Sequence, residues 1–210
     1  TNIPVPEIKV SNNKDKEAIA TFTIFAHGQS SLVVVLSKNG VLVVKKGDNN
    51  NTILKLSLAK ANNVYLDAFY AESLRAFYVL RREGAKYFID KVNLDANDAS
   101  LSNANKTIEV FSEGLEEVKK ARLGIIPRGD DRLSVFIIFP ENGQLLRGTV
   151  CEKKSKSDEW SNPMVFLNPE VAYVSEMKLS GTKDSLITTV CSRNSNVAHS
   201  FSSIVTLTGW

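Results

Sequence analysis

Short apolar runs of four to six residues recur along the whole chain, and stretches of Asn, Gly, Asp and Ser separate them. Val, Ile, Thr, Phe and Tyr dominate the strand-like positions, and this pattern is typical of β-strands joined by turns. The one segment with a helix-like composition is Ser112–Leu123. Its apolar positions are sparse, so we expect a loop that leads into a strand, with at most one helical turn.

A hairpin pattern occurs four times. Each copy starts with a Leu, continues through four or five strand residues, and reaches a turn residue eight to ten positions after the Leu. Asn-Gly at such a turn supplies the positive φ angles of a tight hairpin. The leading leucines are Leu32, Leu74, Leu133 and Leu186, and the turn residues are Gly40, Gly84, Gly143 and Asn194.

Each hairpin also has a strand pattern before it and a short one after it. The preceding strands are expected at 18–26, 64–71, 121–128 and 172–179, and the following ones at 52–58, 107–111, 163–167 and 204–209. The unit therefore has four strands and a period of about 50 residues, which is typical of propeller blades.

We therefore predict an all-β fold, a small β-propeller of about four four-stranded blades in one domain over residues 1–210. The repeats are expected at about 16–60, 61–112, 118–168 and 169–210. The second strands, LVVVL and VFIIF, are apolar on both faces, as expected for strands covered on both sides. The spare strand Pro4–Val10 is expected to close the ring. A β-sandwich is the alternative, but a sandwich needs no internal repeat.

Charge excludes some classes of function. The 26 basic and 23 acidic residues leave a net charge of +3, and the basic residues are scattered. A nucleic-acid-binding protein normally concentrates Lys and Arg on one face, so no nucleic-acid partner is expected. The mixed-charge stretches Glu116–Arg122 and Glu152–Glu159 are interpreted as solvated loops. No apolar run reaches the roughly 18–20 residues of a membrane span, so no membrane span is expected.

The cellular compartment depends on weaker signals. The chain begins with Thr1, which fits a removed leader or a trimmed start. The sequons at Asn50 and Asn105 are candidate glycosylation sites. Cys151 and Cys191 are either one disulfide or two buried thiols. These signals favour secretion, with a cytoplasmic location as the alternative.

The third unit, LSVFIIFPENGQLLRGTV followed by EWSNP, resembles a blade of the fungal fucose-specific lectin family. The resemblance is clear over Arg122–Pro163 and fainter elsewhere. It implies a propeller that binds sugar between blades through an Arg on the second strand, a Glu on the third, and an aromatic ring. The Arg position falls on Val33, Arg75, Ser134 and Ile187, and the Glu position on Val44, Phe88 and Arg147, with no match in the fourth unit. Only Arg75 keeps the pattern, so this chain would have lost most fucose sites or would bind something else.

Three residues are the candidates for sugar contact. Arg75 would donate to hydroxyl groups, and Tyr87 or Trp160 would form the aromatic wall. Each has a structural alternative. Arg75 is predicted in the middle of an apolar strand, where it would form an ion pair. Tyr87 and Trp160 would pack between blades. The segment Tyr65–Leu80 also resembles a hemopexin-like repeat, but the other three units do not repeat it.

Catalytic motifs are absent from the sequence: there is no GxSxG, HExxH, P-loop or paired-cysteine zinc spacing. His27 and His199 have no ligand partner nearby in sequence, and Asp130 and Asp131 lie in an expected turn. We therefore predict a non-enzyme without cofactor or metal, a lectin-like propeller that binds glycans or glycoproteins. Oligomerisation would add avidity. The alternative is a secreted protein-interaction module, an effector or inhibitor that has lost sugar binding. The triplet Arg128–Asp130 is interpreted as a chance Arg-Gly-Asp sequence.

Overall fold

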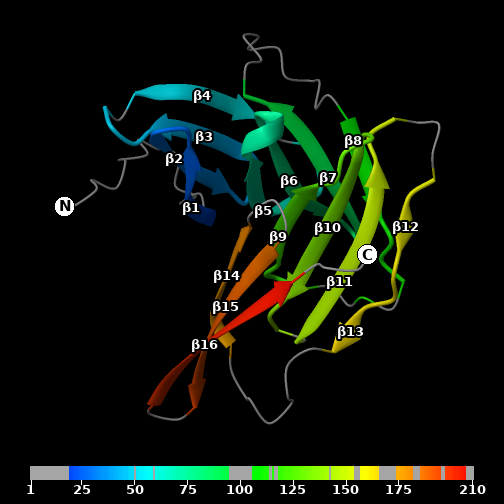
Figure 1. Ribbon diagram of the computed structural model, residues 1–210. Helices are drawn as coiled ribbons and strands as arrows, with labels where there is room; N and C mark the ends of the chain where they lie inside the picture. The colour runs from blue at the N-terminus through cyan, green and yellow to red at the C-terminus, as the bar shows by residue number, and fades with distance from the viewer. Residues whose placement is uncertain are drawn as a thin grey trace. The chain divides into compact units, whose positions relative to one another are not determined.

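The computed structural model describes residues 19–49, 51–58, 60–94, 106–113, 115, 118–141, 143–153, 157–165, 174–181, 185–194 and 197–206. From residue 164 onward the description covers the backbone alone. The described residues form sixteen β-strands and one 3-10 turn, and the strands make four antiparallel sheets (Figure 1). In the first, second and fourth sheets, strands that follow one another in the chain lie side by side, as the hairpin pattern predicts.

The first sheet contains four strands in the order β1-β2-β3-β4. One face is buried along β2, because every second residue of this strand, beginning with Leu32, points into a core shared with the second sheet. The strands are β1 (Ile19–His27), β2 (Ser30–Ser37), β3 (Val41–Lys46) and β4 (Thr52–Ser57).

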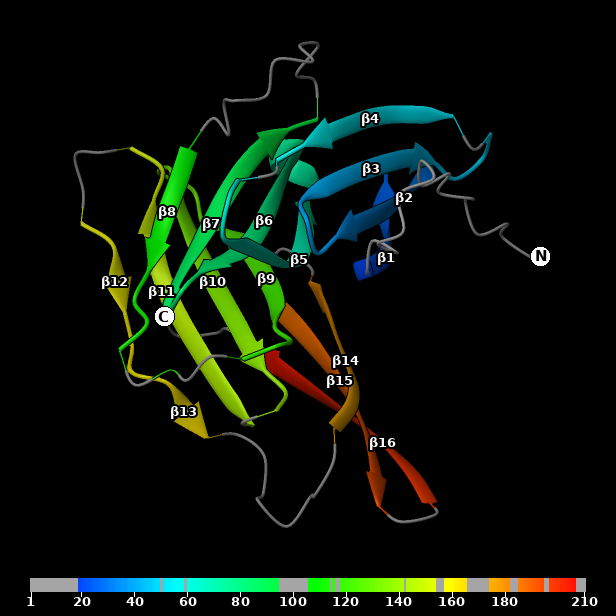
Figure 2. The same ribbon diagram turned by 180° about the vertical axis from the view of Figure 1, so that it is seen from behind.

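The second sheet has the order β5-β6-β7-β8, and it can be followed in both views (Figures 1 and 2). The second sheet contributes Tyr65, Tyr70 and Phe77 to the core that it shares with the first sheet. A 3-10 turn, η1, separates the first two strands. The elements are β5 (Asn63–Ala71), η1 (Glu72–Leu74), β6 (Ala76–Glu83), β7 (Lys86–Asn93) and β8 (Lys106–Val110).

The third sheet differs from the predicted unit at its outer position. Two short strands, β12 and β13, both pair with β11, where one strand at 163–167 was expected. The interior strand β10 is buried from Leu133 to Phe139. The strands are β9 (Arg122–Pro127), β10 (Arg132–Phe139), β11 (Gln144–Cys151), β12 (Glu159–Trp160) and β13 (Met164–Val165).

The fourth sheet corrects one prediction. Its described strands are β14 (Val174–Gly181), β15 (Ser185–Asn194) and β16 (Val197–Thr206), in that order. The prediction of a separate strand at 204–209 is wrong for residues 204–206, because these residues continue β16 and pair with β15. The ring-closing strand Pro4–Val10 lies outside the described residues, as do the sequons at Asn50 and Asn105.

The hairpin turns are confirmed at the three glycines. Gly40, Gly84 and Gly143 have φ values of 88°, 58° and 61°, the left-handed conformation that glycine adopts at least cost. A second recurring feature is a β-bulge close to the start of the first strand of a sheet. The register shifts between Ile19 and Thr21 in β1, between Tyr65 and Asp67 in β5, and between Val174 and Glu176 in β14.

By their contacts the residues group into two compact units. One comprises 1–84 with 90–107, and the other comprises 85–89 with 108–210. The prediction of one domain over 1–210 stays a prediction. No described helix is long and apolar enough to cross a membrane.

Candidate functional site

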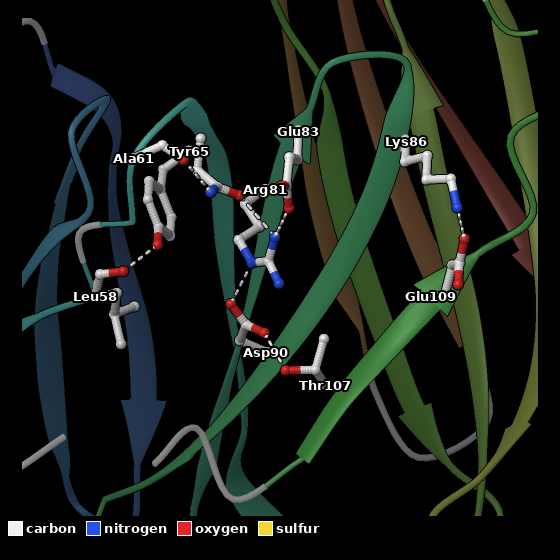
Figure 3. A network of polar contacts seen from close by, with 10 residues as sticks. Leu58, Ala61, Tyr65, Arg81, Glu83, Lys86, Asp90, Thr107 and Glu109 are labelled. Atoms are coloured by element: carbon white, nitrogen blue, oxygen red, sulfur yellow. Dashed lines mark hydrogen bonds and ion pairs between the residues drawn. The ribbon is translucent and has the colours of Figure 1, made fainter. Parts of the chain in front are cut away.

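A buried ion pair is the strongest polar feature of the described residues (Figure 3). Arg81 lies on β6 and Asp90 on β7, the two strands of the hairpin that turns at Gly84. The Arg81 Nε atom donates to Asp90 Oδ2 at 2.7 Å, and the two side chains are only 4% and 2% exposed. A charged pair this deeply buried requires further hydrogen bonds to offset the cost of desolvation.

Neighbouring strands supply those hydrogen bonds. The Arg81 Nη1 atom donates to Asn63 Oδ1 at 2.6 Å and lies 3.5 Å from Glu83 Oε2. Thr107 Oγ1 donates to the second carboxylate oxygen of Asp90 at 2.7 Å. The five residues of this Arg81 network come from all four strands of the second sheet. The network therefore holds the sheet together, and its carboxylate is already occupied by protein donors.

Tyr65 lies beside this network and is also buried. Its hydroxyl donates to the Leu58 carbonyl oxygen, and its ring occupies the space that a side chain at Gly40 would fill. Burial and, to a smaller extent, the nearby Asp90 carboxylate together raise the pKa of Tyr65 to about 12, with the Arg81 guanidinium acting in the opposite direction. The Tyr65 hydroxyl thus stays protonated at neutral pH and acts as a structural donor.

Arg75 does not occupy the predicted position in a strand. It is exposed and follows η1, with the left-handed dihedral angles φ 47° and ψ 42°. Its backbone N–H donates to Glu72 O at 3.0 Å, and its carbonyl oxygen accepts from Leu94 N at 2.8 Å. The prediction of a mid-strand Arg is therefore wrong. The side chain is at a surface turn, where burial cost does not force it to pair.

Tyr87 is fully buried on β7. Its ring packs edge-on against Phe139 with 5.4 Å between ring centroids, and its hydroxyl accepts from the Val118 N–H at 3.4 Å. A ring with no exposed area offers no wall to a ligand. These contacts favour the packing alternative for Tyr87 over the predicted role in sugar binding.

Trp160 is half-buried on the short strand β12, directly opposite Gly148 of β11. The indole lies flat on Gly148, because a Cβ added at that glycine would overlap the six-membered ring. The next residue fixes the strand end, since both the N–H and the hydroxyl of Ser161 donate to Arg147 O at 3.0 Å. Trp160 is therefore held in place from one side and remains partly exposed.

The three candidate residues are divided between the two compact units. Arg75 belongs to one compact unit, and Tyr87 and Trp160 belong to the other. Cys151 is buried at the end of β11. Cys191 lies on β15, where the backbone alone is described, so the disulfide stays a prediction.

Of the two histidines singled out in the sequence, His27 has a structural contact. His27 Nδ1 lies 2.8 Å from the Tyr70 hydroxyl, while His199 lies where side chains are not described. Among the described residues, no group of three His, Cys, Asp or Glu side chains is placed to hold a metal ion.

The Arg-Gly-Asp turn has an unusual backbone. Gly129, Asp130 and Asp131 have consecutive φ values of 66°, 52° and 59°. Arg128 folds back and donates from Nε to Ser134 Oγ at 2.9 Å. Lys153 Nζ lies 2.5 Å from Asp131 Oδ2, and this exposed contact raises the pKa of the lysine. The Arg128 guanidinium is thus bound to the sheet, which supports the reading of a chance triplet.

The Arg81 network is the feature that reasoning from the sequence missed. A signal for it was present. Arg81 and Asp90 are oppositely charged residues in two apolar strands on either side of the Gly84 turn. Charges in such strands are expected to meet across a hairpin.

Comparison with known proteins supports the fold class. No family model and no curated protein matches this chain. Among solved structures, the chain is similar to the β-propeller domain of Nup133 from Vanderwaltozyma polyspora, with a TM-score of 0.53 and 14% identity over 96% of this chain. It is also similar to an α-L-arabinofuranosidase from Podospora anserina solved with cellotriose, with a TM-score of 0.54 and 13% identity over 93% of this chain.

A third similar structure is a GH62 hydrolase in complex with xylotriose, with a TM-score of 0.50 and 14% identity over 92% of this chain. The chain spans 60% of the Nup133 domain and 67% of each of the other two chains. At this level of identity the likeness concerns the fold. The protein is all-β and belongs to the class of small β-propellers with about four blades, as the repeat predicts.

Proposed function

We propose that the protein is a non-catalytic, glycan-binding β-propeller that acts outside the cell. The observation that carries this proposal is the placement of Trp160, a half-buried indole held flat on Gly148 at the outer strand of the third sheet. A fixed aromatic ring with exposed area is what the C–H face of a sugar stacks on. Two of the similar solved structures hold bound oligosaccharides, cellotriose and xylotriose, which is consistent with this class of ligand.

The polar part of a sugar site would come from groups beside the indole. Glu159 is exposed and precedes Trp160 on β12, but consecutive strand residues point to opposite faces, so the polar partners of the ring have to come from residues on the side of the indole. Arg75 is a separate candidate, because its exposed position in the other unit leaves it open to solvent. A single shallow site of this kind loses much of its polar gain to desolvation, so avidity through oligomerisation would strengthen binding.

The absence of catalysis is also proposed. The deeply buried carboxylate of Asp90 is held by Arg81 and Thr107, so it is not a free acid or base. Tyr65, with its raised pKa, is not poised for proton transfer near neutral pH.

The test is a glycan array followed by calorimetry on the best glycan. Trp160→Ala is expected to abolish binding, whereas Trp160→Phe keeps an aromatic face and is expected to retain a weaker signal. Arg75→Ala is compared with Arg132→Ala, another exposed arginine. Thermal unfolding checks that each variant is folded. A blank array at high protein concentration, or full binding by Trp160→Ala, would overturn the proposal.

A further inference from the structure

The third sheet gathers arginines on one of its two sides. Alternate residues of the central strand β10, from Arg132 to Ile138, point to this side. Residues directly opposite each other in an antiparallel sheet point to the same side, and the partners of these β10 residues include three more arginines. We call it the arginine side, and its arginines are Arg122, Arg128, Arg132 and Arg147.

The sheet itself does not balance this positive charge. Among the described residues of the third sheet, Glu159 is the one carboxylate whose pairing places it on the arginine side. Arg128 and Arg132 lie opposite each other, since the Arg128 N–H donates to Arg132 O at 2.8 Å, and like charges in such a pair are destabilising. In the turn between them, the Asp131 carboxylate already contacts Lys153. The arrangement therefore favours an added anion.

The Arg128 guanidinium has one donor that the protein leaves unused. Its Nε atom donates to Ser134 Oγ at 2.9 Å, which holds the group over the sheet. Its Nη2 atom is buried and has no hydrogen-bond acceptor among the described residues. A buried charged donor without an acceptor is strongly unfavourable, and in native proteins such an atom usually has a water or an ion as its partner. The side chain as a whole is half-buried, so a small ligand can approach it.

The surroundings of this guanidinium suit an anion. Ser134 lies directly opposite Thr149, so the Thr149 hydroxyl is on the same side and can donate. Arg147 precedes Thr149 by two residues on β11 and shares that side. Two buried apolar residues, Ile126 and Phe136, lie among these polar groups. Apolar surroundings exclude water and strengthen a hydrogen bond between charged groups.

We propose that the arginine side binds an oxyanion, a carboxylate or a sulfate, at Arg128. Two oxygens of the ligand accept from the unused edge of the guanidinium, in the paired hydrogen bonds that arginine forms with such groups. Arg147 adds positive charge beside them. This site is separate from the proposed glycan site, because Trp160 pairs with Gly148, which alternates with Arg147 along β11 and points to the opposite side of the sheet.

A nuclear magnetic resonance titration of the full 210-residue chain tests the proposal. The probes are sodium acetate and sodium sulfate, each compared with sodium chloride at equal ionic strength. The Arg128 Nε–H signal and the Thr149 backbone amide signal should shift and saturate with at least one oxyanion, with a Kd of about 1–10 mM, and chloride should give no saturation. Saturation by acetate alone assigns a carboxylate ligand, and saturation by sulfate alone assigns a tetrahedral oxyanion.

Three variants separate this site from a general effect of charge. Arg128→Lys keeps the charge but loses the planar fork, and it should weaken binding about tenfold or more, as measured at the Thr149 amide. Arg147→Gln should weaken binding about threefold or more. Lys55→Gln is the matched control, because it removes one exposed positive charge from the other compact unit, and it should bind within about twofold of the native chain.

Thermal unfolding shows that each variant is folded. No saturable shift with either oxyanion up to about 100 mM would overturn the proposal. So would an equal response to chloride, or an unchanged affinity in Arg128→Lys.

Discussion

Tyr65 is predicted to make the stability of the protein fall in alkaline solution. Its pKa is about 12 in the folded protein and about 10 in the unfolded chain, so the folded state retains the proton over this pH range. Because the pKa is raised, the stabilisation is fully present below pH 10 and is lost as the pH rises toward 12. The linkage relation gives a loss of about 1 kcal/mol by pH 11 and about 2 kcal/mol by pH 12.

The variant Tyr65→Phe isolates this effect. At pH 8 the variant should be less stable by about 1–2 kcal/mol, because the buried Leu58 carbonyl oxygen loses its donor. Its stability should then fall less steeply with pH, so that the difference between the two proteins shrinks by about 1 kcal/mol at pH 11. Urea denaturation followed by circular dichroism at pH 8, 10 and 11 measures this difference. A difference that stays constant across these pH values would refute the reasoning.

Two further predictions concern stability. Asp90→Ala removes the carboxylate partner of the buried Arg81 and should cost about 3–5 kcal/mol, whereas Glu109→Ala, which breaks an exposed ion pair with Lys86, should cost less than about 1 kcal/mol. Equal shifts of the urea midpoint would contradict this ranking. Gly148→Ala should displace the overlying indole, lower stability by about 1–3 kcal/mol, and shift tryptophan emission to longer wavelength. Unchanged emission and stability would show that the ring does not depend on this glycine.

The hairpins are the part of the fold that local sequence could predict. Asn or Glu before a glycine fixes the turn, and the apolar strand that precedes it fixes the direction of the chain. Gly40, Gly84 and Gly143 confirm this. The outer strands could be predicted less accurately, because the position of a short strand depends on where the neighbouring strand has an unpaired edge. This is why β12 and β13 share β11.

The candidate site was harder to predict for a related reason. The prediction that Arg75 lies within a strand treated residues 74–78 as one continuous strand. In the structure, Glu72–Leu74 form a 3-10 turn, and Arg75 follows it at the surface. The burial of Tyr87 depends on Phe139 and Val118, which are far away in sequence. Periodicity reports which face a residue occupies within one element, and it carries no information about contacts between distant elements.

The bulges at the starts of β1, β5 and β14 have a consequence for how such a chain can evolve. A bulge holds one residue outside the regular pairing, so loss of that residue restores an ordinary ladder and leaves every later pair in register. The third sheet, in which β9 pairs regularly with β10, shows the ladder without a bulge. Single-residue insertions and deletions can therefore accumulate at these positions without turning a buried side chain toward solvent. Repeats that tolerate such length drift lose their sequence likeness while their sheets remain alike.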